Sequence, residues 1–178
     1  MTGRRPVSSN DLVVGRWGAR FQGRHMPCSH GRGGVRADKR EGDLASPTGA
    51  YRLLWVYWRA DRLARPATAL SAAPLGPQQG WSECPDDPDY NRPIRHPHPF
   101  AADRMARGDA LYDICAVTDQ NRGPTHPGRG SAIFVHLWRK PRHPTAGCIA
   151  FRRQDLVWIL ARWTHDSRLI IQPSGGLA

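Results

Sequence analysis

The chain has 178 residues, of which 39% are hydrophobic and seven are tryptophan, and it carries a formal net charge of +11. A chain of this length can bury a sizeable core, so we expect residues 1–178 to form a single domain. It holds no run of about eighteen apolar residues, which excludes a transmembrane helix, and no apolar signal-peptide stretch follows its basic N-terminus.

Strand patterns dominate the first third of the chain. Leu12–Val14 and Tyr51–Trp58 are rich in β-branched and aromatic residues, and both predict β-strands. Gly31–Gly34 and Ser46–Gly49 concentrate glycine, serine and proline, and they predict turns.

The middle of the chain changes character twice. Residues 66–99 contain many prolines and glycines with little periodicity, and they predict one long ordered loop. We expect a short helix near Ala101–Met105 and a strand over Tyr112–Val117. A turn at Asn121–Pro124 then precedes the apolar run Ser131–Leu137, which is typical of a buried strand.

A second helix is predicted close to the C-terminus, over residues 153–164. Its apolar residues recur at i, i+3, i+4 and i+7 and form one stripe: Leu156, Ile159, Leu160 and Trp163. Asp155 suits the N-terminal end of the helix dipole, and Leu169–Ile171 predicts a final strand. The sequence therefore predicts a mainly β fold with one or two helices.

The chain has four cysteines: Cys28, Cys84, Cys115 and Cys148. His25-x2-Cys28-x-His30 has the spacing of half a zinc site, but no second pair of ligands follows, so we expect no metal and no cofactor. If Cys148 is a nucleophile it must be free, and the other three cysteines then allow at most one disulfide.

The segment Thr145–Ile149 places a cysteine directly after a glycine, twelve residues beyond His136. A thiolate nucleophile needs a base and a backbone that exposes the sulfur. Gly147 lets the backbone bend, and His136, at the end of an apolar run, supplies the base. The alternative interpretation is a buried structural cysteine beside an ordinary histidine.

This arrangement resembles the signature of the YkuD-type L,D-transpeptidases, which cross-link bacterial peptidoglycan through a cysteine. The family pattern is a histidine, a gap, then Ser/Thr-His-Gly-Cys, an apolar residue and Arg or Asn. The blocks Lys39–Asp43 with Ser46–Gly49, Tyr90–Pro93 and Tyr112–Asp113 resemble further family motifs, so the likeness runs from about residue 31 to the C-terminus. It implies a β-sandwich-like catalytic domain.

The chain departs from the family pattern at two positions. Ala146 replaces the motif histidine and Ala150 replaces the Arg or Asn. The missing histidine is not the usual base, so the resemblance still implies a Cys148–His136 dyad. The second loss affects substrate contact, and three nearby residues could compensate: Arg142, His143 and Arg152. His143 is also a rival base, but His136 holds the family position at a strand end, where rigidity suits a base.

The resemblance implies peptidoglycan stem peptides as both donor and acceptor. Cys148 would form a thioester with the acyl carbon of the first-position L-alanine or of the third-position diaminopimelate. It would then pass the acyl group to a diaminopimelate amine, giving 1–3 or 3–3 cross-links. Backbone around Thr145, Ala146 and Gly147 would hold the oxyanion. The resemblance also implies covalent inhibition by carbapenems and action in the periplasm or cell envelope, and we expect a monomer.

Several further residues are candidate substrate contacts, and loop packing is the alternative interpretation for each: Tyr90, Asn91, Arg92, Tyr112, Asp113, Trp138, Arg142 and His143. The second ring nitrogen of His136 needs an orienting partner. Asp119 or Asn121 could provide it, and so could a backbone carbonyl, which is frequent in the family.

Two other functions compete with transpeptidation. A peptidoglycan peptidase or amidase would use the same nucleophile with water as acceptor. A basic nucleic-acid-binding module would use the positive charge, but Lys39 and Lys140 are the only lysines and the arginines are dispersed. No recognition helix, zinc finger or RNP-type strand accompanies them, so we expect no nucleic-acid partner.

Overall fold

The computed structural model describes residues 5–173, which form fifteen strands and one helix. Each element has the following bounds: β1 Leu12–Gly15, β2 Gly18–Phe21, β3 Arg24–Met26, β4 Val35–Arg36, β5 Ser46–Pro47, β6 Gly49–Tyr51, β7 Leu53–Trp58, β8 Ser71–Pro74, β9 Gln79–Ser82, β10 Pro93–Arg95, β11 Ala102–Arg104, β12 Ile114–Thr118, β13 Phe134–Leu137, β14 Ile149–Phe151, α1 Arg153–Arg162 and β15 Leu169–Ile171. The predicted mainly β fold is confirmed.

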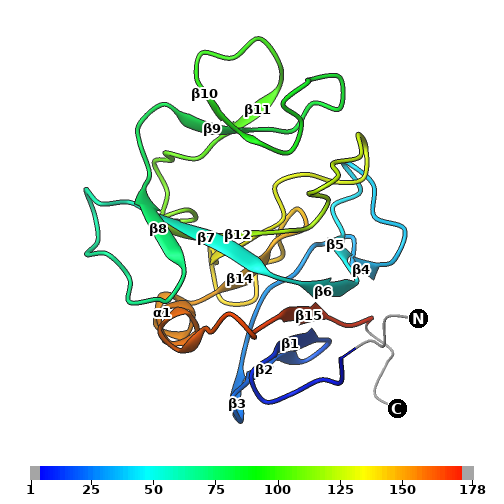
Figure 1. Ribbon diagram of the computed structural model, residues 1–178, viewed down its shortest axis with the longest axis vertical. Coiled ribbons are helices and arrows are strands. Elements are labelled where there is room, and N and C mark those ends of the chain that lie inside the picture. The colour runs from blue at the N-terminus through cyan, green and yellow to red at the C-terminus, as the bar shows by residue number, and fades with distance from the viewer. Residues whose placement is uncertain (1–4, 174–178) are drawn as a thin grey trace.

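The strands form three stacked layers (Figure 1). The lower sheet has the order β3-β2-β1-β15-β6, the middle sheet β14-β13-β12-β7-β8 and the upper sheet β10-β9-β11, while β4 and β5 pair separately. In the middle sheet β13 runs antiparallel to β12 and parallel to β14. The strands that carry His136 and follow Cys148 are therefore direct neighbours.

The middle sheet is buried on both faces. Successive side chains of a strand point to opposite sides, and Ala116 and Val135 accordingly belong to the core shared with the lower sheet. Cys115, Val117 and Phe134 belong to a second apolar cluster on the other face. This double burial explains the nearly continuous apolar run before His136. Cys148, just before β14, also belongs to the second cluster.

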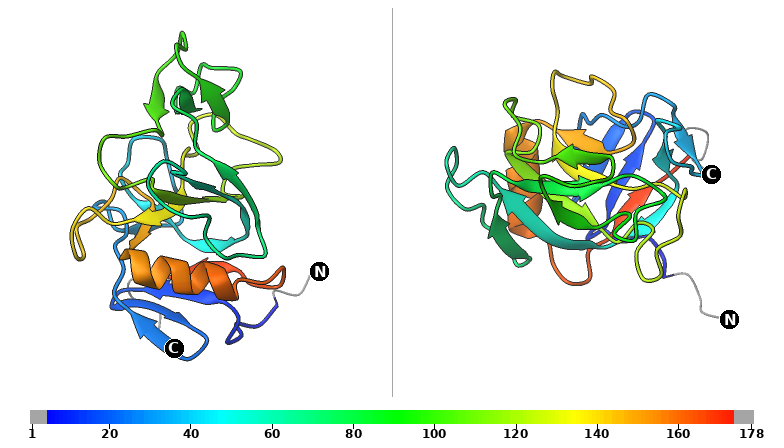
Figure 2. Two further views of the ribbon diagram at one scale, coloured as in Figure 1. Left: turned by 90° about the vertical axis from the view of Figure 1, so that its left-hand side faces the viewer. Right: turned by 90° about the horizontal axis from the view of Figure 1, so that it is seen from above.

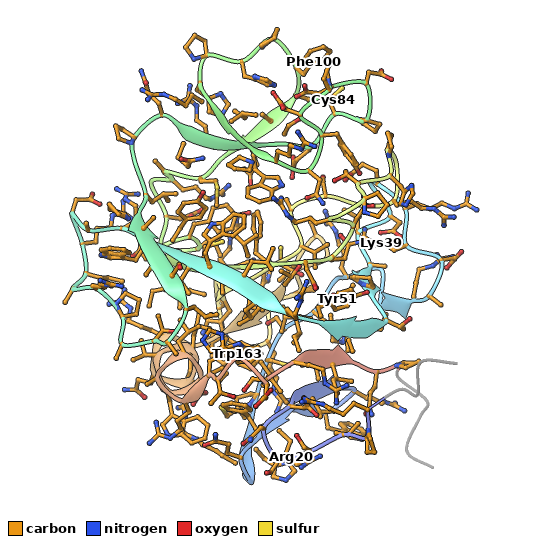
Figure 3. The ribbon with its side chains drawn as sticks, viewed as in Figure 1. Arg20, Lys39, Tyr51, Cys84, Phe100 and Trp163 are labelled. Carbon is orange, nitrogen blue, oxygen red and sulfur yellow. The ribbon has the colours of Figure 1, made fainter. Side chains whose placement is uncertain are left out.

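The helix α1 lies alongside the sheets and covers one edge of the main core (Figure 2). Trp163, just beyond its end, stacks on Phe21 of the lower sheet with ring centroids 5.8 Å apart, and it lies between the lower and middle sheets (Figure 3). The fully buried Asp155 accepts hydrogen bonds from Arg24 at 2.8 Å and from Arg152 at 2.6 Å. Asp155 thus connects α1 to β3 through Arg24, in addition to its interaction with the helix dipole.

Several local predictions are wrong. Ser46–Gly49, expected as a turn, forms β5 and the start of β6, and residues 66–99 contain β8, β9 and β10. Prolines are tolerated there because β8 and β10 are edge strands, where a missing N–H breaks no ladder. The segment Ala101–Met105, expected as a helix, contains strand β11, because pairing with β9 outweighs local helix propensity.

The expected strand over Tyr51–Trp58 is divided. Its first residue closes β6 in the lower sheet, and the remainder from Leu53 forms β7 in the middle sheet. The strand predictions at residues 12–14 and 169–171 are confirmed, and these two strands pair in parallel. No helix within residues 5–173 has the length and apolar character needed to cross a membrane.

Candidate active site

One cavity of about 520 Å³ contains both Cys148 and His136. Its walls come from β13, from the segments that follow β9 and β11, and from the loops 39–44 and 139–146. His136 lies in β13, and Cys148 directly precedes the adjacent parallel strand β14, where Ala150 pairs with His136. The cavity thus brings together the two residues that the sequence motif marked.

The Cys148 sulfur is held between two backbone groups of the segment before and in β13. It accepts the Phe134 N–H at 3.3 Å and donates to the Ala132 carbonyl at 3.0 Å. Burial raises the pKa of the Cys148 thiol to about 12, while the Phe134 N–H acts in the opposite direction. The resting thiol is therefore protonated and needs a base. All four cysteines of the chain are free.

The backbone before the cysteine is fixed by Gly147, whose φ is +146°. A Cβ at this position would lie 2.9 Å from the Ala45 carbonyl oxygen, so no other residue fits without strain. The buried Ser46 hydroxyl donates to the Gly147 carbonyl at 2.6 Å and accepts the Gly31 N–H at 2.9 Å. Ser46 thus connects the nucleophile loop to strand β5.

The Thr145 side chain closes the turn that contains the nucleophile. Its hydroxyl donates to the Cys148 carbonyl at 2.6 Å and accepts the Gly147 N–H at 3.1 Å. Because that N–H is already bonded, the candidate oxyanion donors in this loop are the N–H groups of Ala146 and Cys148. Thr145 therefore acts as a structural cap of the loop rather than as an oxyanion donor.

His136 is buried and its ring is fixed on two sides. Nδ1 lies 2.7 Å from the Leu137 carbonyl oxygen, which can only accept, so Nδ1 carries the proton and Nε2 has the free lone pair. The Tyr112 ring packs edge-on at 5.2 Å between centroids. Burial lowers the pKa of His136 to about 4. The imidazole is neutral near pH 7, which is the state a general base requires.

The orienting partner of His136 is thus a backbone carbonyl, one of the possibilities left open by the sequence. Asp119 instead bonds Arg52 at 3.0 Å, and Asn121 donates to the carbonyls of His126 and Gly130.

Five more residues predicted at the site line this cavity: Tyr112, Trp138, His143, Thr145 and Ala146. His143 is exposed, whereas His136 is 5% exposed. A buried, hydrogen-bonded ring is held in one orientation, so the structure favours His136 over its rival as the base.

Five of the predicted substrate contacts are not among the residues that line the cavity: Tyr90, Asn91, Arg92, Asp113 and Arg142. Tyr90 donates to the Glu41 carboxylate, and Asp113 accepts from Arg62 at 2.8 Å. Arg92 is exposed beside Asp89, and Arg142 lines a different cavity next to β1–β3. Arg152, expected as a possible replacement for the lost motif residue, pairs with Asp155.

Asn91 has an indirect connection to the site. Its Oδ1 accepts the Trp81 indole N–H at 3.0 Å and the Ala132 N–H at 3.1 Å. Ala132, with φ of +52°, is the residue whose carbonyl meets the Cys148 thiol. Asn91 therefore supports the backbone behind the sulfur instead of reaching the cavity.

The cavity also holds ionic residues that sequence reasoning does not single out individually: Arg32, Lys39, Glu41, Glu83, Asp103, Arg107 and Arg139. Lys39 and Glu41 belong to a block that resembles a family motif, which is their one signal in the sequence. Glu83 and Asp103 lie in segments expected to be a loop and a helix, respectively. Nothing in the sequence therefore indicates that these two side chains line the cavity.

Burial raises the pKa of Glu83 to about 7, and the negative charges of Asp103 and Glu41 act in the same direction. Asp103 and Glu41 therefore lie near enough to Glu83 to repel its charge, and Asp103 and Glu83 also disfavour a negative charge on Cys148. The site combines a neutral imidazole, a protonated thiol and a wall that carries both carboxylates and cationic side chains.

Comparison with known proteins gives one family. Residues 13–171 match the family described as YkuD, L,D-transpeptidase catalytic domain. Neither the curated proteins nor the solved structures give a match.

Proposed function

The chain belongs to the YkuD family of L,D-transpeptidase catalytic domains, and we propose that it is a peptidoglycan transpeptidase with Cys148 as nucleophile and His136 as base. One observation carries this proposal: a single cavity holds a buried thiol and a neutral imidazole whose Nε2 is free to accept a proton. Enzymes of this family act on the cell wall, and we propose the periplasm or cell envelope as the place of action.

In the acylation step, the Cys148 sulfur leaves the Ala132 carbonyl and gives its proton to His136 Nε2. The sulfur attacks the acyl carbon of an L-centre in the donor stem, and the C–N bond to the D-residue breaks. His136 returns the proton to the departing amine, and a thioester remains. Burial disfavours a thiolate–imidazolium pair before substrate arrives, so we expect proton transfer to accompany the attack.

The transition state of this step carries a negative oxygen. The N–H groups of Ala146 and Cys148 are the proposed donors to it, and removal of one such donor costs roughly 3–4 kcal/mol in comparable sites. The Phe134 N–H contacts the sulfur itself and stabilises developing thiolate charge.

In the second step, the side-chain amine of diaminopimelate in an acceptor stem attacks the thioester. A C–N bond forms, the C–S bond breaks, and the Cys148 thiol is restored. The donor is either the first-position L-alanine or the third-position diaminopimelate of a stem, so the product is a 1–3 or a 3–3 cross-link. The arginines of the cavity suit the free carboxylates of both stems.

Incubation with defined disaccharide-tetrapeptide muropeptides, followed by mass spectrometry, tests the proposal. The wild type is expected to give dimers whose fragmentation identifies the donor residue, and a Cys148→Ala variant is expected to give none. Cys148-dependent shortened monomers without dimers would instead identify a hydrolase. No product from the wild type, together with no covalent adduct on incubation with a carbapenem, would refute the enzyme proposal.

A further inference from the structure

The residue Glu83 stands out among the carboxylates of the cavity. It follows strand β9, and its backbone N–H is fixed to the Ala101 carbonyl beside β11 at 3.2 Å. Its half-buried side chain lines the cavity that holds Cys148. Within residues 5–173, no hydrogen bond or ion pair engages the Glu83 carboxylate.

The other two carboxylates on this wall already have partners. Asp103 accepts the Tyr112 hydroxyl at 2.7 Å, and Glu41 accepts the Ser131 hydroxyl at 2.8 Å. These bonds hold the two negative charges in place, and both charges repel that of Glu83. A cation entering the cavity would relieve this repulsion and give Glu83 the partner it lacks.

Four cationic side chains line the cavity, and none of the ion pairs within residues 5–173 joins one of them to Glu83. Lys39 pairs with Asp43, and Arg107 pairs with Asp109 at 2.9 Å. The place beside Glu83 is therefore open to a cation from the substrate. The proposed reaction supplies one, because the acceptor amine is an alkylammonium with an ordinary pKa of about 10.4 in solution.

We propose that Glu83 binds the protonated amine of the acceptor stem and takes its proton, so that the free amine can attack the thioester on Cys148. This inference rests on the proposed function and names the residue that selects the acceptor. The recognised chemistry is a primary alkylammonium group.

The protons of the transfer step then balance between two residues. The Glu83 carboxylate accepts the first proton from R–NH3+, which leaves a neutral amine with a lone pair. As the C–N bond forms, the nitrogen gives a second proton to His136, which passes it to the sulfur when the C–S bond breaks. The products are the amide cross-link, the Cys148 thiol and protonated Glu83, which returns its proton to solvent.

Glu83 is better suited than His136 to accept the first proton of the ammonium group. Burial lowers the pKa of His136 to about 4, whereas Glu83, at about 7, is the stronger base by far. Proton transfer from an ammonium group becomes easier as the acceptor becomes more basic.

The half-reactions can be measured separately on the full chain. Donor stem alone should acylate Cys148, which intact-protein mass spectrometry detects as a thioester. Acceptor stem is then added at several concentrations, and the rate of dimer formation is recorded. The variant is Glu83→Gln, which keeps the shape and removes the charge. The matched control is Asp86→Asn, which removes one charge from an exposed residue of the same segment.

Glu83→Gln is expected to acylate at least as fast as the wild type, because it removes a charge that opposes the Cys148 thiolate. Its transfer to the amine is expected to be at least about 100-fold slower, with a higher KM for the acceptor. Asp86→Asn should match the wild type in both steps. Wild-type transfer by Glu83→Gln would overturn the inference, and so would an equal loss of acylation and transfer. If the wild type itself forms no Cys148 thioester, the proposed function fails before Glu83 is tested.

A binding measurement gives a second test that needs no catalysis. In the Cys148→Ala background, an acceptor stem with a free amine should bind at least about tenfold more tightly than its N-acetylated form. Adding Glu83→Gln should remove this difference. A preference for the free amine that survives Glu83→Gln would overturn the inference.

Discussion

Replacing Ser46 with alanine tests whether hydrogen bonding from β5 positions the nucleophile. The Ser46 side chain is fully buried, and its hydroxyl joins two loops by donating to Gly147 and accepting from Gly31. Ser46→Ala leaves the Gly31 N–H and the Gly147 carbonyl without that partner. Each unsatisfied buried backbone group costs about 1–3 kcal/mol, so the loss of two partners should lower the free energy of unfolding by about 2–6 kcal/mol.

The same change should affect catalysis beyond its effect on stability. The Gly147 carbonyl belongs to the residue directly before Cys148, so its release lets the sulfur and the adjacent N–H groups move. A misplacement of about 1 Å at a reacting group costs on the order of 100-fold in rate. We therefore expect the rate of Cys148 acylation, measured on the folded fraction, to fall by about 10- to 100-fold.

The assay combines urea unfolding with the rate of thioester formation under native conditions. Ser167→Ala is the control, since its buried hydroxyl also accepts a backbone N–H, that of Thr164 at 3.1 Å, but lies beyond the helix. The control should lose stability and keep its acylation rate. If Ser46→Ala behaves in the same way, the hydroxyl does not position the nucleophile and the reasoning is refuted.

The site and the core support three further predictions. Gly147→Ala should abolish acylation and lower the free energy of unfolding by about 1–3 kcal/mol. The new Cβ would clash with the Ala45 carbonyl oxygen, and the positive φ at this position strains any residue other than glycine. Acylation at the wild-type rate would contradict this geometry. Burial lowers the pKa of His136 below its unfolded value of about 6.5, so the unfolded state binds more protons between pH 6.5 and 4. The free energy of unfolding should therefore fall as the pH drops through this window, by up to about 3 kcal/mol. His136→Gln should flatten this part of the pH profile measured by urea unfolding, and an unchanged pH dependence would argue against a buried neutral ring. Asp155→Asn should lower the free energy of unfolding by about 1–3 kcal/mol, a value that allows for the partial exposure of Arg24 and Arg152. Acylation of Cys148 in the folded fraction should stay unchanged. A selective loss of acylation would show that the contacts of Asp155 influence the active site.

The proposed nucleophile and base could be selected from the sequence because their signal is local. Cys148 follows a glycine within a short motif, and His136 ends an apolar run at the family spacing. The roles of these two residues remain proposals, but their meeting in one cavity agrees with the motif. The C-terminal helix and the strand at residues 169–171 were predictable for the same reason, since a stripe of period 3.6 and a β-branched run are properties of neighbouring residues.

Positions that depend on pairing between distant segments could not be predicted. β11 looks helical by composition, yet it is a strand because β9 lies beside it, and the prolines of β8 and β10 are permitted by their places at sheet edges. Asn91 carries a polar side chain in a family-like block, but only the tertiary structure shows that it supports the Ala132 backbone behind the sulfur.

The sequence by itself thus indicated the mainly β character and the family, and it marked Cys148 and His136 as the candidate pair, because each of these signals lies in short-range patterns. Only the tertiary structure decided the electrostatics of the site. The low pKa of His136 and the raised pKa of Glu83 arise from burial and from charges brought in by remote segments. The sequence does not show the surroundings of a charged side chain, because the fold alone determines whether it faces water, an ion-pair partner or a reacting thiol.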